Sequence, residues 1–371
     1  MQTEAIPLLA AAPGTWQALT VHRFGTPGAR PLAYVQAALH ADEMPGVIAA
    51  LALRERLATL DAQGLVRGEI VLVPFANPIG LAQRLLGGAV GRFDLADGGN
   101  FNRHFARLGP DVAEAVAGRL GPDAAANAGT IRVALAAAAA ALPATTPAQD
   151  LKRTLLRLAV GADLVLDLHC DSEAVMHLYT LTPQAEAFAP LTALLGCEAV
   201  LLAEESGDDP FDEACSRPWL EIARRHPDRP VPLGCLAATV ELRGQADVDT
   251  ALAAADSAAL LAYLALCGVV EATVPPIPAP RCKPTPLAGS EPLVAPQAGL
   301  VAYRRRPGDR VSEGDVVADI LDPETGRSTP VVAPTSGLLY ARSGSRFAYS
   351  GKRLGKVAGT TIRRTGKLLS P

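Results

Sequence analysis

The sequence predicts an α/β fold with a mixed, mostly parallel sheet flanked by helices, followed by a small all-β domain. Two buried-strand patterns each end in a histidine, at His40 and His169, and the first leads directly into a helical pattern. A proline-rich stretch then precedes a series of short strands and turns. We therefore expect one domain over residues 1–273, an extended linker over 274–285 and a β-rich domain over 286–371.

The composition excludes several classes of protein. The 371 residues are 49% hydrophobic, which supplies ample material for a core, and the net charge is -4 with no long basic stripe. No stretch approaches the roughly 18 uninterrupted apolar residues of a membrane helix. We therefore expect neither a nucleic acid nor a membrane as partner. The six cysteines are scattered without a C-x-x-C pair, and no secretory signal precedes them, so we expect a reduced, cytoplasmic protein.

The first informative segment covers residues 33–46. An extended apolar run ends at His40, Glu43 follows three residues later, and Pro45 begins a helical pattern. An imidazole and a carboxylate at this spacing can bind one divalent metal ion, and zinc accepts both donors. The pair alone is a weak signal, because a solvated loop histidine beside a helix-starting acid has the same spacing.

A second buried-strand pattern at 70–75 is followed by a glycine-rich, polar stretch from Gly87 to Arg103. A long irregular segment beside strand ends is typical of an active-site loop. Arg92, Asn102 and Arg103 lie in it, and such side chains near a metal suit binding a carboxylate and polarising a carbonyl group. The alternative for each is a side chain that faces water. His104 is expected to be structural.

Residues 110–160 are rich in alanine and predict helices. The next buried strand, 162–171, again ends in a histidine, His169, which supplies a third candidate ligand. Two histidines and one glutamate with an open fourth position form a catalytic zinc arrangement rather than a closed structural one.

The remaining segments before the linker are a predicted loop, a strand and a helix. Ser206 to Asp228 is polar and contains glycine and prolines, so we expect a surface loop. Residues 236–244 predict a strand that carries Glu241, and residues 247–266 predict a helix. A strand-end carboxylate that faces a metal-activated water can act as a general base. An ordinary exposed glutamate is the alternative.

Together, His40-x-x-Glu43, Asn102-Arg103, His169 and Glu241 resemble, in order and spacing, the succinylglutamate desuccinylase and aspartoacylase family. The resemblance covers about residues 30 to 270 and implies the zinc-carboxypeptidase-like fold. It implies one zinc ion per chain, bound by His40, Glu43 and His169. Glu241 matches the base that takes the proton of the attacking water.

The same resemblance assigns the loop residues. Arg103 with Asn102 matches the pair that holds the substrate carboxylate, and Arg92 matches the arginine that stabilises the carbonyl oxygen. The family's usual Asp-Leu-Asn-Arg is here Asn100-Phe101-Asn102-Arg103, so the acid that braces this loop is missing. This departure suggests a substrate other than acetylaspartate or succinylglutamate.

The expected activity is hydrolysis of the amide bond of a small N-acyl amino acid. A carboxypeptidase acting on short peptides uses the same groups, and a non-catalytic homologue is a third option. The C-terminal domain is similar to the barrel-sandwich modules that carry biotin or lipoate, but no lysine occurs between Lys283 and Lys352, so we reject covalent carriage. We expect this domain to cap the active site or to form the interface of a homo-oligomer. The sequence identifies neither half of the substrate.

Overall fold

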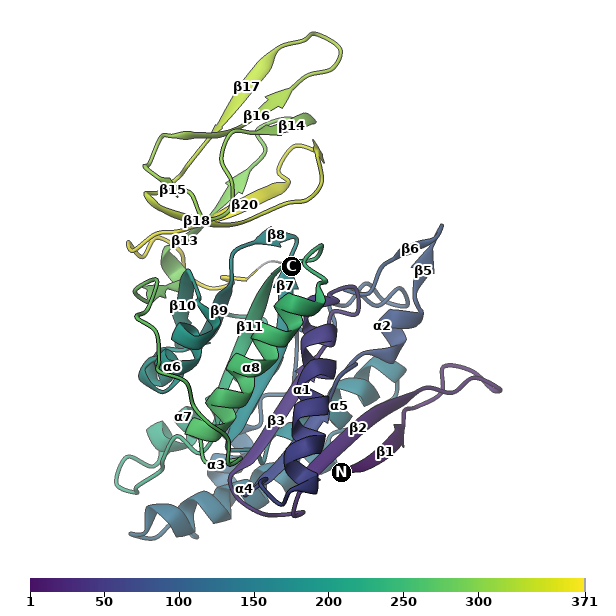
Figure 1. Ribbon diagram of the computed structural model, residues 1–371, viewed down its shortest axis with the longest axis vertical. Helices are drawn as coiled ribbons and strands as arrows, with labels where there is room; N and C mark the ends of the chain where they lie inside the picture. Colours follow the sequence, from purple (N-terminus) through teal and green to yellow (C-terminus); the bar gives the residue numbers. More distant parts are fainter. Residues whose placement is uncertain (370–371) are drawn as a thin grey trace.

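The computed structural model describes residues 1–369. A nine-stranded sheet forms the centre of the larger unit (Figure 1). In spatial order its strands are β1 (Gln2–Pro7), β2 (Ala18–Gly25), β4 (Glu69–Val73), β3 (Leu32–Ala37), β7 (Leu164–Asp171), β11 (Leu236–Gly244), β9 (His177–Leu181), β10 (Ala199–Ala203) and β12 (Thr285–Pro286).

The sheet is mixed but mostly parallel. The four central strands β4, β3, β7 and β11 run parallel to one another. Antiparallel pairings join β2 to β4 on one side and β9 to β11 on the other. Strands β3 and β7 are mostly apolar and are buried along almost their whole length, as expected for parallel strands covered on both faces.

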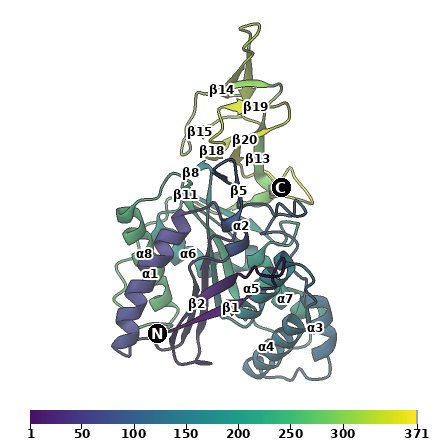
Figure 2. The ribbon, with the colours of Figure 1, turned by 90° about the vertical axis from the view of Figure 1, so that its right-hand side faces the viewer.

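Helices cover both faces of the sheet, which gives three layers (Figure 2). One face packs against α1 (Pro45–Ala62), α6 (Ala185–Leu195) and α8 (Thr250–Leu266). The other face packs against α3 (Gly109–Val116), α4 (Ala124–Ala141), α5 (Pro147–Ala159) and α7 (Phe211–Arg225). The short helix α2 (Pro78–Ala82), the hairpin β5 (Arg84–Leu85) and β6 (Gly88–Ala89), and the 3₁₀ turns η1 (Thr182–Gln184) and η2 (Leu287–Gly289) complete this unit.

The β-rich unit stands above the carboxyl ends of the central strands (Figure 1). One of its sheets contains β13 (Ser290–Val294), β20 (Arg353–Ala358), β18 (Gly337–Arg342) and β15 (Arg310–Val311). The other contains β17 (Ser328–Val332), β16 (Val316–Leu321), β14 (Gly299–Tyr303) and β19 (Phe347–Ala348). Strand β8 (Glu173–Ala174), which directly follows β7, pairs with β18. The predicted fold class is confirmed.

The helix α4 is long and apolar enough to cross a membrane by length and composition alone. It packs against α3 and α5, and Ile131, Leu135 and Ala139 on one of its sides are buried in the core. Core helices of this kind meet the same criterion.

One expectation is wrong. Residues 211–225, within the stretch predicted as a surface loop, form the helix α7, and most of its first turns are buried. Acidic residues in its first turn and Arg224 and Arg225 in its last turn suit the helix dipole. Burial of Phe211 and Trp219 outweighs the penalty of Pro218 in the helix interior. The division of the chain at residues 274–285 stays a prediction.

Candidate active site

The first two candidate ligands follow strand β3. The chain leaves β3 at Ala37, and His40 lies in the turn before α1, whose first residue is Pro45 as predicted. The N–H of Glu43 donates to the carbonyl of His40 within this turn (3.1 Å). Both residues are only 3% exposed. This turn therefore brings an imidazole and a carboxylate to the carboxyl end of a central strand, where α/β sheets bind their ligands.

His169 reaches the same place from the neighbouring strand β7. Because β3 and β7 are parallel, their carboxyl ends meet at one edge of the sheet. The Nδ1 atom of His40 lies 3.0 Å from Glu43 Oε1, and the Nδ1 atom of His169 lies 2.8 Å from Glu43 Oε2. The three donor atoms lie within 4.8 Å of one another, so this buried group could hold a metal ion.

The outer nitrogens of both imidazoles face acceptors. His40 Nε2 lies 2.9 Å from Asn100 Oδ1, and His169 Nε2 lies 3.0 Å from Asp167 Oδ2. The acceptor at His40 Nε2 favours the tautomer with its proton there, which leaves a lone pair on the Nδ1 atom that faces Glu43. Two imidazoles and a carboxylate face one another in one buried place, an arrangement that a cation or extra protons can balance. The donor set therefore fits a divalent metal ion.

The ionisable side chains of this site shift one another's pKa values. Burial lowers the pKa of His40 to about 4, and Arg92 acts in the same direction. For Glu43, burial alone would raise the pKa, but His40 and His169 outweigh it and hold it well below its usual value. For His169, the carboxylates of Asp167 and Glu43 outweigh the effect of burial and raise the pKa. The ionised carboxylate of Glu43 and the uncharged imidazole of His40 are the forms that bind a metal ion.

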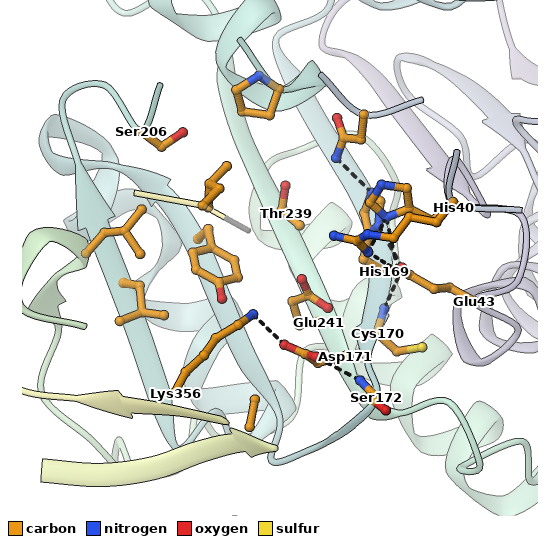
Figure 3. A pocket seen from close by; sticks show the side chains of 18 of the residues that line it. His40, Glu43, His169, Cys170, Asp171, Ser172, Ser206, Thr239, Glu241 and Lys356 are labelled. Atoms are coloured by element: carbon orange, nitrogen blue, oxygen red, sulfur yellow. Dashed lines mark hydrogen bonds and ion pairs between the residues drawn. The ribbon is translucent and has the colours of Figure 1, made fainter. Parts of the chain in front are cut away.

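Glu241 lies beside this group on β11, directly opposite His169 in the register of the two parallel strands. Its side chain lines the cavity, and its Oε2 atom is buried and accepts no hydrogen bond from the described residues. Burial, followed by the charges of Glu43 and Asp171, raises the pKa of Glu241 to about 8. Figure 3 shows Glu241 between the histidines on one side and Lys356 on the other.

The two arginines enter from the loop after β6. The Nη1 atom of Arg92 lies 3.2 Å from both Glu43 Oε1 and His40 Nδ1, so this guanidinium contacts the candidate ligands themselves. Arg103 is buried, lines the same cavity and donates to the carbonyl of Asn102 (2.6 Å). Burial, followed by the charge of Arg92, lowers the pKa of Arg103 to about 10. Arg103 therefore remains a cation at neutral pH.

Asn102 is also at the cavity, but its polar atoms already have protein partners. Its Oδ1 atom accepts from the N–H of Phe211 at the start of α7 (2.9 Å), and its Nδ2 atom lies 3.3 Å from His169 Nε2. The side chain therefore joins the loop, α7 and the candidate ligand. His104, expected to be structural, is exposed and does not line the cavity.

All seven predicted site residues line one cavity of about 330 Å³. Its wall also includes residues that sequence reasoning missed. Tyr179, Asp212 and Thr239 come from the larger unit, and Arg342, Leu354 and Lys356 come from the β-rich unit. The cysteine Cys170, which follows His169, is buried beside Glu43, and burial raises the pKa of its thiol. No motif could have identified the contribution of β18 and β20, because only the fold brings them there.

Comparison with known proteins finds similarity to one family. The model of the succinylglutamate desuccinylase/aspartoacylase catalytic domain matches residues 29–119, which contain His40, Glu43, Arg92 and Arg103. A succinylglutamate desuccinylase/aspartoacylase family protein from Shewanella amazonensis is similar over 96% of this chain and 98% of its own, with 28% identity and a TM-score of 0.86. The predicted family is confirmed.

Two further solved structures are similar to this chain. One, named for the same family and from Shewanella frigidimarina, has 25% identity and a TM-score of 0.86 over 96% of this chain and 97% of its own. The ectoine utilization protein EutE (DoeB) from Ruegeria pomeroyi has 20% identity and a TM-score of 0.69 over 97% and 95% of the two chains, which shows a shared fold. No curated protein sequence matches the chain.

Proposed function

We propose that this chain is a zinc-dependent hydrolase that cleaves the amide bond of a small N-acyl amino acid. The proposal rests on the convergence in one cavity of three buried metal donors, two arginines, and a carboxylate oxygen that has no hydrogen-bond partner in the described part of the chain. Such a set matches the needs of metal-assisted amide hydrolysis: a metal site, a base, and cations for a carboxylate and for developing negative charge.

The ligands in this proposal are His40, Glu43 and His169, which would hold one zinc ion per chain. Zinc bound there would lower the pKa of a coordinated water to about 7 and polarise the amide carbonyl. Glu241 takes the proton of the attacking water. It then returns this proton to the leaving nitrogen, which would otherwise depart as a strongly basic anion. Its buried Oε2 atom, which has no hydrogen-bond partner among residues 1–369, is compatible with both steps.

The remaining residues bind and orient the substrate. Arg103 offers a buried guanidinium that suits two parallel hydrogen bonds to a carboxylate. Arg92, next to the ligands, is suited to stabilise the negative charge that develops on the carbonyl oxygen. Asn102 was predicted to bind the carboxylate with Arg103. Since both polar ends of Asn102 already have partners, we propose that it instead orients His169 and the loop.

The size of the cavity favours a deacylase over a carboxypeptidase. A volume of about 330 Å³ lies at the low end of the range for small-molecule sites, which begins near 300 Å³. Strands β18 and β20 and Leu369 form part of its wall, so little room remains for a peptide chain that extends beyond the bond to be cleaved. A metallocarboxypeptidase that acts on short peptides remains the second candidate.

The test is metal analysis and hydrolysis of a matched panel by the purified protein. The panel pairs N-acetyl, N-succinyl and longer N-acyl derivatives of several amino acids with di- and tripeptides that end in the same amino acids. We expect about one zinc per chain and faster cleavage of the N-acyl amino acids. Faster cleavage of the peptides would favour the carboxypeptidase. A protein that binds zinc but cleaves no member of either set would favour a non-catalytic homologue.

Two further predictions accompany this proposal. We propose a catalytic domain over residues 1–273, a linker over 274–285 and a β-rich domain over 286–371, although β12 at the end of the linker adds to the large sheet. A cytoplasmic location is compatible with the six cysteines, all of which are free.

A further inference from the structure

The β-rich unit contributes directly to the candidate active site. Strand β7 carries His169 and Asp171, and the chain continues through Ser172 into β8, which pairs with β18 of the β-rich unit. Gly344 of the β-rich unit donates its N–H to the hydroxyl of Ser172 (2.8 Å). The segment that follows the candidate ligand His169 is therefore attached to the second unit.

Lys356 on β20 makes a further attachment, and this one lies at the cavity. Its Nζ atom donates to Asp171 Oδ2 at 2.6 Å, and its side chain is 26% exposed and lines the cavity (Figure 3). The Nζ atom lies 5.9 Å from the centre of the Tyr340 ring, a favourable position for a cation. Burial acts to lower the pKa of Lys356, but the carboxylate of Asp171 outweighs it, so the side chain remains an ammonium ion.

The ammonium group of Lys356 shares the cavity with several carboxylates. Glu43, Asp171 and Glu241 all line the cavity, and the charges of Glu43 and Asp171 act on Glu241. The other carboxylate oxygen of Asp171 accepts from the N–H of Ser172 (2.8 Å), so Asp171 is held from two sides. If Lys356 were neutral, Asp171 would be an unpaired carboxylate beside Glu241, and the two would repel each other in a place of low dielectric.

We propose that Lys356 is a positioning residue of the active site: its ion pair with Asp171 fixes the segment after His169 and keeps Glu241 in its working position. The β-rich unit then supplies a necessary part of the reaction site. This inference rests on the proposed function, in which Glu241 is the base.

The experiment compares Lys356→Met with a matched control, Lys367→Met. Lys367 also joins the C-terminal part of the chain to the larger unit, through an ion pair to Asp208 of the same length, 2.6 Å, but it is exposed and does not line the cavity. We expect Lys356→Met to lower kcat by roughly 10- to 100-fold, with the zinc content retained and KM changed by less than about threefold. Lys356→Arg, which keeps the charge, should restore most of kcat, and Lys367→Met should leave kcat within about twofold of the original.

A second measurement does not depend on activity. Hydrogen exchange of the backbone amides of residues 170–172 should be faster in Lys356→Met than in Lys367→Met or the unsubstituted protein. If Lys356→Met is too unstable to purify, Lys356→Met/Asp171→Asn removes the unpaired carboxylate. It should show the same low kcat as expected for the single variant, because the two residues act as a unit.

Unchanged kcat and unchanged amide exchange in Lys356→Met would overturn the inference. Loss of zinc together with activity would also overturn it, because Lys356 would then act on metal retention and not on Glu241. If the unsubstituted protein cleaves no amide, the proposed function fails. The exchange measurement still decides whether Lys356 fixes the segment.

Discussion

The imidazole of His40 donates from Nε2 to the side-chain oxygen of Asn100, 2.9 Å away. The same oxygen accepts from the N–H of Asn102 (2.8 Å), so one amide group orients a candidate ligand and braces the loop. In the sequence, Asn100 stands where the family usually has an acid. A neutral oxygen acceptor can take over both hydrogen bonds, although the Nδ2 atom of Asn100 is then buried without a partner among the described residues.

Asn100→Leu is predicted to weaken zinc binding, because His40 loses the acceptor that fixes its tautomer and orientation. Partners of this kind typically contribute roughly 10- to 100-fold to metal affinity. Asn100→Asp keeps the acceptor, relieves the unpartnered Nδ2 atom and should bind zinc at least as tightly as the original. Competition against a chelator of known affinity measures both variants. Equal affinity of Asn100→Leu and the unsubstituted protein would show that Asn100 does not support the site.

Arg103→Met is predicted to raise KM for N-acyl amino acids more than it lowers kcat, because the substrate loses its carboxylate anchor. Loss of a charge-assisted, two-fold hydrogen bond corresponds to about 2–4 kcal/mol, or roughly 30- to 1000-fold in kcat/KM. Arg107→Met is the control, since Arg107 lies on the same loop but forms exposed ion pairs with Glu205 and Glu221. A fall in kcat at constant KM would assign Arg103 to another step.

Arg92→Met is predicted to lower kcat more than it raises KM, which is the reverse of the effect expected for Arg103→Met. Arg92 is placed to stabilise charge that exists only in the transition state, so kcat should fall by roughly 100-fold with little change in KM. The guanidinium also donates to Glu43, so zinc content has to be measured in parallel. If only KM rises, Arg92 binds the substrate and does not stabilise the developing oxyanion.

Because His177 is buried, we predict that the free energy of unfolding depends on pH. His177 lies fully buried on β9, its Nδ1 atom lies 2.8 Å from the Val175 carbonyl, and burial lowers its pKa to about 4. Below the ordinary value of 6.5, the unfolded chain binds a proton here and the folded chain does not, so stability is lost as the pH falls from 6.5 towards 4.

Between pH 7 and pH 5 this loss amounts to about 2 kcal/mol. His177→Gln, which cannot titrate, should therefore lose less stability over this interval than the original protein. Urea unfolding at the two pH values measures the difference. Parallel pH profiles in the two proteins would contradict the assignment to His177.

The sequence was informative about the ligands because their positions follow from strand ends. His40 and His169 come at the ends of buried parallel-strand patterns, and such ends meet at one edge of a sheet. The helix α7 could not be predicted, since Pro210 and Pro218 are loop signals and only tertiary burial of Trp219 outweighs them. The ion pair between Asp171 and Lys356 could not be predicted either, because 185 residues separate the partners and only the docking of the β-rich unit brings them together.

The role of Glu241 as the base is tested most directly by Glu241→Gln, assayed with the best N-acyl amino acid of the panel and with zinc determined in the same sample. Glutamine keeps the size of the side chain but cannot accept and return a proton. We predict about one zinc per chain, a similar KM and a kcat lower by roughly 100- to 10,000-fold. A zinc-loaded Glu241→Gln protein that cleaves the substrate at the original rate would contradict the assignment of Glu241 as the base.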